Sequence, residues 1–487
     1  MKLKIYGVAT IMLLLASLSS CQKDKLNPVS NTSISDANAF DNASRINLQV
    51  SGLYAAIKTG NFYASRYLIY NDVRGENFIN ETNNVVTARN VWDFTVPSSD
   101  TYLTGLWNAA YAAINKANIF MEGMQAKGNS VVGADLAKQY NGEAKLIRAV
   151  CYYALVQMYA RPYWDGNGSK PGVPLRLKGI TSAGSNNLAR SSVAEVYAQI
   201  ISDLDSAEAN LPADYKDATK NVIRAQRNTA IALKTRVYLS MGNYAKVIEE
   251  ANKMVPATAP FQTSAGVPAG LEANVKTVFT SYTSKEVIFT MPFVTGSDVP
   301  GGQSQLASYY MPASSPTGGA GEFSLNAKGI IAEKSWTDGD ARRGFIYSGS
   351  NGKKWLAKWT TPTPYPDWIP VIRYAEVLLN LAEAKARVSG TVDAQSVALL
   401  NAIRNRSDAA TTFTTGSFAT SQDLLDAILL ERNIEFLGEG IHAIDIQRLG
   451  LPFPAKGSVA AVDATNSAYI WQIPTSETAY NTLCVPN

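Results

Sequence analysis

Apolar side chains recur every three or four residues along much of the first 255 residues of this 487-residue chain. This spacing places them on one face of a helix, which is the pattern of helices that pack against one another. It predicts helices over 40–58, 103–124 and 136–159. Pro162 ends the third of these, because proline cannot continue a helix. The first third of the chain is therefore expected to be helical.

Two further patterns extend the helical region. Ser192 is followed three residues later by Glu195, a capping box that predicts a helix from there to about Leu211. Residues 228–255 carry two apolar stripes separated by a turn at 241–244. This pair resembles a tetratricopeptide-type hairpin, with an ordinary helical hairpin as the alternative. A continuous 34-residue period is not visible, so a solenoid built only of repeats is not supported.

The amino-acid composition changes over 257–370, where Gly, Ser, Thr, Pro and Tyr dominate. A short strand is predicted at 287–289, and helices return at 371–388 and 422–437. Long irregular segments inside a folded protein tend to carry function. The residues that forbid long helices here are Gly301-Gly302, Gly318-Gly319, Pro362, Pro364, Pro366 and Pro370.

The N-terminus predicts export. Lys2 and Lys4 precede an apolar run over 5–18, which is too short to span a bilayer but suits a signal peptide. The run ends in Leu-Ser-Ser-Cys21, which is similar to a lipobox, so we expect Cys21 to be lipidated and to anchor the protein. The alternative is an ordinary signal peptide with an unrelated cysteine. The predicted division is a signal peptide at 1–20, a flexible tether at 21–39, and a single domain at 40–487 whose C-terminal third begins at 371.

Composition excludes several classes of function. The formal net charge is only +4 and no basic block is present, which argues against nucleic-acid binding. His442 is the only histidine, so zinc clusters and Ser-His-Asp triads are not expected. No phosphate-binding loop, dinucleotide fingerprint, paired CxxC or EF-hand is present, and we predict no metal and no cofactor. Cys151 and Cys484 could pair or remain buried thiols, and their spacing does not decide.

The C-terminal third carries an ordered set of distinctive stretches, at 371–379 with 382–384, 400–406, 431–436 with 439–440, 445–450, and 473–481. Upstream stretches that belong with them are Trp107, 142–149, 172–175 and the hairpin at 228–255. In this order, the set resembles the SusD/RagB family. The family often has a basic-aromatic pair where His442-Ala443 stands here, and a local packing difference is expected.

The resemblance implies a mainly α fold with tetratricopeptide-like hairpins beneath a large, irregular, loop-rich ligand-binding face. It also implies a cell-surface lipoprotein of the outer membrane, facing outward. Such a protein binds a nutrient oligomer, most often a glycan, and delivers it to a SusC-like TonB-dependent transporter. The alternatives are a peptide-uptake lipoprotein of the same fold, a glycoside hydrolase, and a helical scaffold for protein partners.

Three carboxylates on one predicted helix raise the question of catalysis. Glu431, Glu435 and Glu439 lie four residues apart, a spacing that could hold two carboxylates at the separation a glycosidase needs. Several arginines accompany them in the same motifs, and carboxylates facing arginine more often form structural ion pairs. We therefore predict a protein that is not an enzyme, with no catalytic residues.

Ligand contacts are predicted where aromatic rings and polar groups occur together, because a sugar offers CH groups on one face and hydroxyls at its rim. Trp355, Trp359 and Trp368 are weaker candidates, and Trp107 is assigned to the core. For every aromatic the alternative is packing beneath the loops. The predicted contacts are Asp72, Arg74, Asn77 and Trp92 in the N-terminal region, and Tyr309, Tyr310 and Trp336 in the irregular segment.

Overall fold

The computed structural model describes residues 38–182, 184, 186–293 and 298–487. The predicted signal peptide, Cys21 and nearly all of the tether lie outside them. Among the described residues, no helix combines the length and the apolar character needed to cross a bilayer. The division of the chain into signal, tether and one domain stays a prediction.

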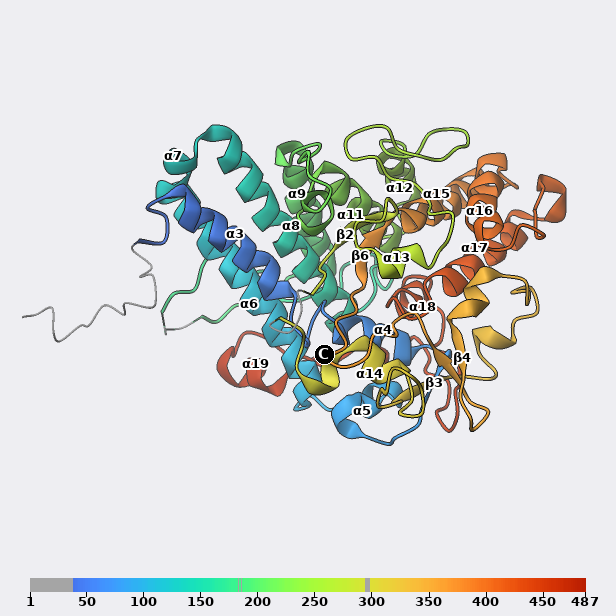
Figure 1. The fold of residues 1–487 in the computed structure, drawn as a ribbon. Coiled ribbons are helices and arrows are strands. Elements are labelled where there is room, and N and C mark those ends of the chain that lie inside the picture. The colour runs from blue at the N-terminus through green and yellow to red at the C-terminus, as the bar shows by residue number, and fades with distance from the viewer. Residues whose placement is uncertain (1–37, 183, 185, 294–297) are drawn as a thin grey trace, which may run out of the picture.

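Long helices packed side by side form one layer of the molecule. The layer runs from α3 at the left of Figure 1 to α16 and α17 at the right. Each helix contacts the next in the following order, and α17 also packs on α15. The helices are α3 (Ala43–Ile57), α6 (Thr101–Gly123), α8 (Ala134–Tyr159), α9 (Val193–Asn210), α11 (Arg227–Ser240), α12 (Tyr244–Ala251), α15 (Tyr374–Ser389), α16 (Ala394–Ser407) and α17 (Ser421–Glu435).

Local signals explain where these helices begin and turn. In α3 the predicted stripe of Ile46, Val50 and Leu53 is fully or almost fully buried. The capping box at the start of α9 forms as predicted, with the side chains of Ser192 and Glu195 each accepting from the other residue's backbone N–H. The helices predicted from periodicity are thus confirmed to within a few residues.

The helix predicted from residue 371 starts later than expected. Pro370–Arg373 forms strand β6, which pairs antiparallel with β2 (Val287–Thr290). The backbone N–H of Tyr374 still donates to the carbonyl of Glu286 at 2.8 Å, and α15 begins at that residue. A short apolar run suits a strand or a helix equally, and here a distant strand partner decides.

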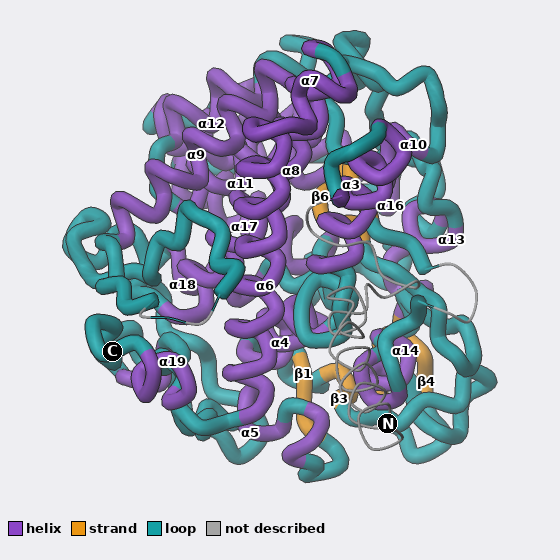
Figure 2. The backbone as a smooth tube through the Cα atoms, turned by 90° about the vertical axis from the view of Figure 1, so that its left-hand side faces the viewer, coloured by secondary structure: helices purple, strands orange, loops and turns teal. Residues whose placement is uncertain are grey.

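A loop-rich part of the molecule lies below the helical layer. Figure 2 shows many of the loops in the lower half, around α5, α14 and the small strands. These strands form one antiparallel sheet in the order β1 (Phe78–Asn80), β3 (Phe323–Leu325), β5 (Lys354–Leu356) and β4 (Ile346–Ser348). The short helices are α4 (Arg66–Arg74), α5 (Arg89–Trp92), α7 (Asn129–Val132), α10 (Lys220–Ile223), α13 (Thr277–Thr280), α14 (Leu306–Tyr310), α18 (His442–Arg448) and α19 (Thr475–Tyr480).

One continuous cluster of buried apolar side chains extends from Phe40 to Cys484. It includes Trp107, which is 2% exposed, so the assignment of this residue to the core is confirmed. Cys151 and Cys484 are both buried free thiols and do not form a disulfide. The helical layer and the loop-rich part therefore share a core.

Candidate ligand-binding site

All seven predicted ligand contacts are buried, and none has more than 5% of its surface exposed. A buried ring cannot stack on a ligand from solvent, and a buried polar group cannot reach one. The structure therefore gives no support to a direct contact for any of them, and that role stays a prediction. The seven residues are Asp72, Arg74, Asn77, Trp92, Tyr309, Tyr310 and Trp336.

Asp72 joins three segments that are distant in sequence. Its two carboxyl oxygens accept from the backbone N–H of Gly440 at 3.0 Å and from the hydroxyl of Tyr310 at 3.2 Å. The ring of Tyr310 stacks in turn on Trp359, with centroids 5.8 Å apart. Burial raises the pKa of Asp72 to about 8, so this carboxyl group is protonated at neutral pH. Asp72 acts as a buried hydrogen-bonding group of the fold.

Replacing Asp72 with asparagine should stabilise the protein at neutral pH. Because its folded-state pKa lies above the unfolded value, Asp72 contributes fully to the free energy of unfolding below about pH 4. This contribution is lost as the pH rises towards 8. The amide cannot ionise, so we expect the variant to gain about 1–3 kcal/mol at pH 7.5 and little at pH 4. Urea unfolding at the two pH values measures this. Equal stability of the two proteins at pH 7.5 would contradict it.

Trp92 and Asn77, also predicted in the N-terminal region, are buried beneath the surface that β1 and the turn after β3 form. The indole N–H of Trp92 donates to the carbonyl of Phe78 at 2.8 Å. The amide of Asn77 donates to Asn433 at 2.7 Å and accepts from the backbone N–H of Ile330 at 2.9 Å. These contacts fix the start of β1 and the turn after β3.

Lys456, from the C-terminal part of the chain, also lies beneath this surface and contacts the end of α4. Its buried ammonium donates to the carbonyls of Val73, Arg74 and Gly75, which end α4. The guanidinium of Arg74 lies 4.6 Å from the ring centroid of Phe453. Two segments more than 370 residues apart are thereby joined.

The residues predicted in the irregular segment take other positions. The ring of Tyr309 lies parallel to Phe323, and Trp336 lies beneath the guanidinium of Arg343 at 4.2 Å. Trp355 and Trp359 are buried and Trp368 is partly buried. The structure thus brings Tyr310 together with Asp72 and leaves Trp336 apart.

Above these supports lies an open groove of about 830 Å³, which we call the sheet groove. Four chain segments line it: the end of α4 with β1, the turn after β3, the turn before β5, and the turn at 454–457. Its lining residues are Glu76, Ile79, Glu81, Ser324, Leu325, Asn326, Ala327, Lys328, Asn351, Gly352, Lys353, Lys354, Pro454, Ala455, Lys456 and Gly457.

Both carboxylates of the sheet groove have cationic partners. Glu76 lies 2.9 Å from the Nε2 atom of His442, and Glu81 forms an ion pair with Lys353 and accepts from the hydroxyl of Ser324. Burial opposes the charge on Glu76, but the His442 charge outweighs it and lowers the pKa of Glu76 to about 2. Burial likewise opposes the charge on His442, and Glu76 raises the pKa of that imidazole above its usual value.

Replacing His442 with glutamine should remove stability in a defined pH range. Because its pKa is raised, His442 contributes its full stabilisation of the fold below about pH 6.5 and loses it at higher pH. Because its pKa is lowered, Glu76 contributes its full stabilisation above about pH 4.5. The loss should therefore be largest at pH 5–6, at about 1–3 kcal/mol, and smaller at pH 9. Thermal unfolding across this range measures it. A loss that does not change with pH would argue against the ion pair.

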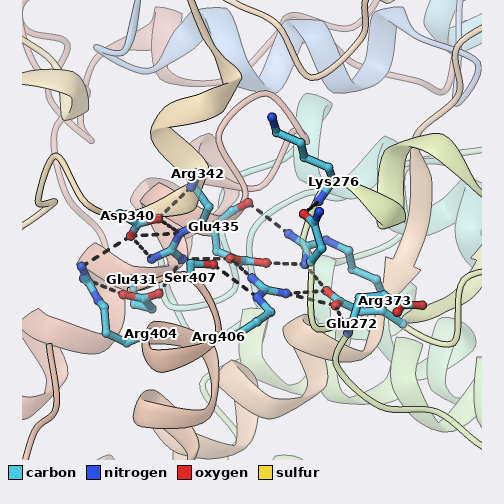
Figure 3. Close-up of polar contacts among 12 residues, drawn as sticks. Glu272, Lys276, Asp340, Arg342, Arg373, Arg404, Arg406, Ser407, Glu431 and Glu435 are labelled. Atoms are coloured by element: carbon cyan, nitrogen blue, oxygen red, sulfur yellow. Dashed lines mark hydrogen bonds and ion pairs between the residues drawn. The ribbon is translucent and has the colours of Figure 1, made fainter. Parts of the chain in front are cut away.

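A second polar cluster is structural. Arg342 contacts both Glu431 and Glu435, and Arg373 and Arg406 also reach Glu435. Each of these side chains has at most 4% of its surface exposed. Figure 3 shows their dense mutual contacts. The prediction that these carboxylates pair with arginine is confirmed. The cluster fixes the irregular segment, which supplies Arg342, to β6, α16 and α17.

The polar residues that line the sheet groove, such as Lys328, Asn351 and Lys354, were not among the predicted contacts. The Asn351-Gly352 turn between two short strands was an available signal. Trp164 was not predicted either, although at 45% it is the most exposed of the eight tryptophans, all of which lie within the described residues. Trp164 does not line the sheet groove.

Comparison with known proteins identifies the family. A family model described as "Starch-binding associating with outer membrane" matches residues 24–239. A SusD superfamily protein from Bacteroides fragilis, solved as a crystal structure, is 32% identical, covers 92% of this chain and 99% of its own, and superposes with a TM-score of 0.81. The chain belongs to the SusD family.

Other SusD-like proteins agree over the whole length. A SusD superfamily structure from Bacteroides thetaiotaomicron is 24% identical, covers 92% of this chain and 99% of its own, and has a TM-score of 0.79. SusD-like protein P2 from Formosa agariphila is 26% identical over all of this chain and 99% of its own. The predicted mainly α SusD-like fold is confirmed.

Proposed function

We propose that this SusD-like protein binds a glycan in the sheet groove and takes part in nutrient uptake at the outer membrane. The observation that carries the proposal is the groove itself, which gathers hydroxyl, amide, ammonium and carboxylate groups from four segments around an open volume of about 830 Å³. These groups suit the rim of hydroxyls on a sugar. The family description, starch binding and association with the outer membrane, points the same way.

The buried residues beneath the groove have a positioning role in this proposal. Trp92 and Asn77 hold β1 and the turn after β3, and Lys456 holds the end of α4. Rigid support of this kind keeps the exposed groups in place before a ligand arrives, which lowers the entropic cost of binding.

In the proposed function, the protein binds its ligand without cleaving it. Hydrolysis of a glycoside needs one carboxylic acid that is protonated at working pH, and its pKa must therefore be raised. Glu76 has a pKa of about 2, and Glu81 is held in an ion pair with Lys353. Neither carboxylate of the groove suits the role of general acid.

The rest of the proposal concerns place and partner. Cys21 would carry the lipid anchor on the outer surface, and a SusC-like transporter would receive the glycan. Incorporation of labelled palmitate into the wild type but not into Cys21→Ala would support the anchor. Recovery of a TonB-dependent transporter with the purified wild-type protein would support the partner.

Calorimetric titration of the mature chain against a glycan panel, with a peptide mixture alongside, tests the function. We expect heat from at least one glycan and no shortened product when the mixture is afterwards separated. Released sugars would indicate a hydrolase, and binding of the peptides alone would indicate peptide uptake. A chain that binds neither would act as a scaffold.

A further inference from the structure

The lysines that line the sheet groove outnumber its carboxylates. Its two carboxylates both have partners within the protein, because Glu76 bonds the Nε2 atom of His442 and Glu81 pairs with Lys353. A carboxylate already paired and partly buried has little attraction left for a ligand cation. The acidic side of the groove is therefore neutralised from within.

Two ammonium groups remain available on the basic side. Lys328 and Lys354 are exposed at the groove, and neither makes an ion pair within the part of the chain that the structure describes. The Nζ of Lys354 donates to the hydroxyl of Ser348 at 2.7 Å, which leaves two of its three hydrogens for other acceptors. Lys456 is left out of this balance, because its buried Nζ already donates to three backbone carbonyls, those of Val73, Arg74 and Gly75.

The groove also lacks aromatic rings. No Phe, Tyr or Trp is among its lining residues, and Ile79 is the one large apolar side chain there that is not buried. Neutral sugars are commonly held by stacking of their CH faces on aromatic rings, and this groove does not offer that contact. Ionic hydrogen bonds are stronger than neutral ones and can take over that part of the binding energy.

We infer that the sheet groove selects acidic oligosaccharides, whose carboxylate or sulfate groups contact Lys328 and Lys354. This inference rests on the proposed function and names its substrate class. Both acid groups are anions with several acceptor oxygens, which suit the three donors of an ammonium. Glu76 and Glu81 hold the surrounding cations in position and do not contact the acid group.

Titration with matched pairs of oligosaccharides tests the inference. An oligogalacturonate is compared with its carboxyl-reduced neutral form, and a sulfated galacto-oligosaccharide with its desulfated form, all of one length. We expect at least one acidic member to bind about tenfold or more tightly than its neutral partner. Its affinity should also fall between 50 and 300 mM salt, because salt screens exposed charges. The pair that shows the difference identifies the acid group.

Two variants assign the effect to the groove. The double variant Lys328→Gln, Lys354→Gln should lose about tenfold in affinity for the acidic ligand, and Lys334→Gln should lose none. Lys334 is an exposed lysine of the same segment that does not line the groove. Equal affinity for acidic and neutral members would overturn the inference and leave the proposed function intact. Binding of no saccharide at all would overturn both.

Discussion

Replacing Glu435 with alanine should lower the free energy of unfolding by about 3–5 kcal/mol or more. Its buried carboxylate contacts the guanidinium groups of Arg342 at 2.9 Å, Arg373 at 2.6 Å and Arg406 at 2.5 Å. These arginines hold the pKa of Glu435 well below its usual range, although burial opposes the charge. Without the carboxylate, three buried cations would lose a shared partner and repel one another.

Guanidinium-induced unfolding of the purified mature chain measures this loss. Glu435→Gln keeps the shape of the side chain and removes the charge, so we expect an intermediate loss. The control is Glu249→Ala, because the side chain of Glu249 is 55% exposed and forms an ion pair with Lys246 on the same helix. That variant should unfold at nearly the same denaturant concentration as the wild type, because an exposed ion pair contributes little to stability. Losses of similar size at the two positions would show that burial of the cluster does not matter.

Replacing Ala327 with tryptophan should reduce glycan affinity at least about tenfold, or 1.4 kcal/mol. Ala327 is exposed and lines the sheet groove. A bulky indole at this position would occupy volume that the proposed ligand needs, and the exposed site gives no reason for a loss of stability. Calorimetric titration gives the affinity, and a thermal melt of the same sample gives the stability.

The matched control for this variant is Ala257→Trp. Ala257 is also exposed, lies in a loop of the irregular segment, and does not line the sheet groove. It should bind glycan as the wild type does. If Ala327→Trp also binds normally with an unchanged melting temperature, the glycan contacts another surface. The exposed ring of Trp164 would then be the next position to test, by Trp164→Ala.

The helical part of the fold was predictable because its signals are local. A stripe such as Ile46, Val50 and Leu53, or a capping pair such as Ser192 and Glu195, lies within one or two helical turns. Such patterns depend little on the rest of the chain. The start of α15 was less predictable, because β6 forms only when β2 is beside it.

The site was harder to predict because long-range pairing assembles it. Residues 76–81 meet 324–328 where β1 pairs with β3, and Lys456 joins the turn at 454–457 to the end of α4. The side chains predicted as ligand contacts near Asp72 turn inward and are buried. A polar residue indicates an exposed position only when the fold offers it no buried hydrogen-bond partner. Asp72 has two such partners, Gly440 and Tyr310.

The cluster around Arg342 has a consequence for protein engineering. Its members come both from the irregular segment, with Asp340, Arg342 and Lys358, and from the helices, with Glu431 and Glu435. Recombination between homologues that exchanged the loops alone would separate these ion-pair partners and bury unpaired charges. A chimaera designed for new specificity should therefore transplant loops and helices as one module, or confine its changes to solvent-facing turns.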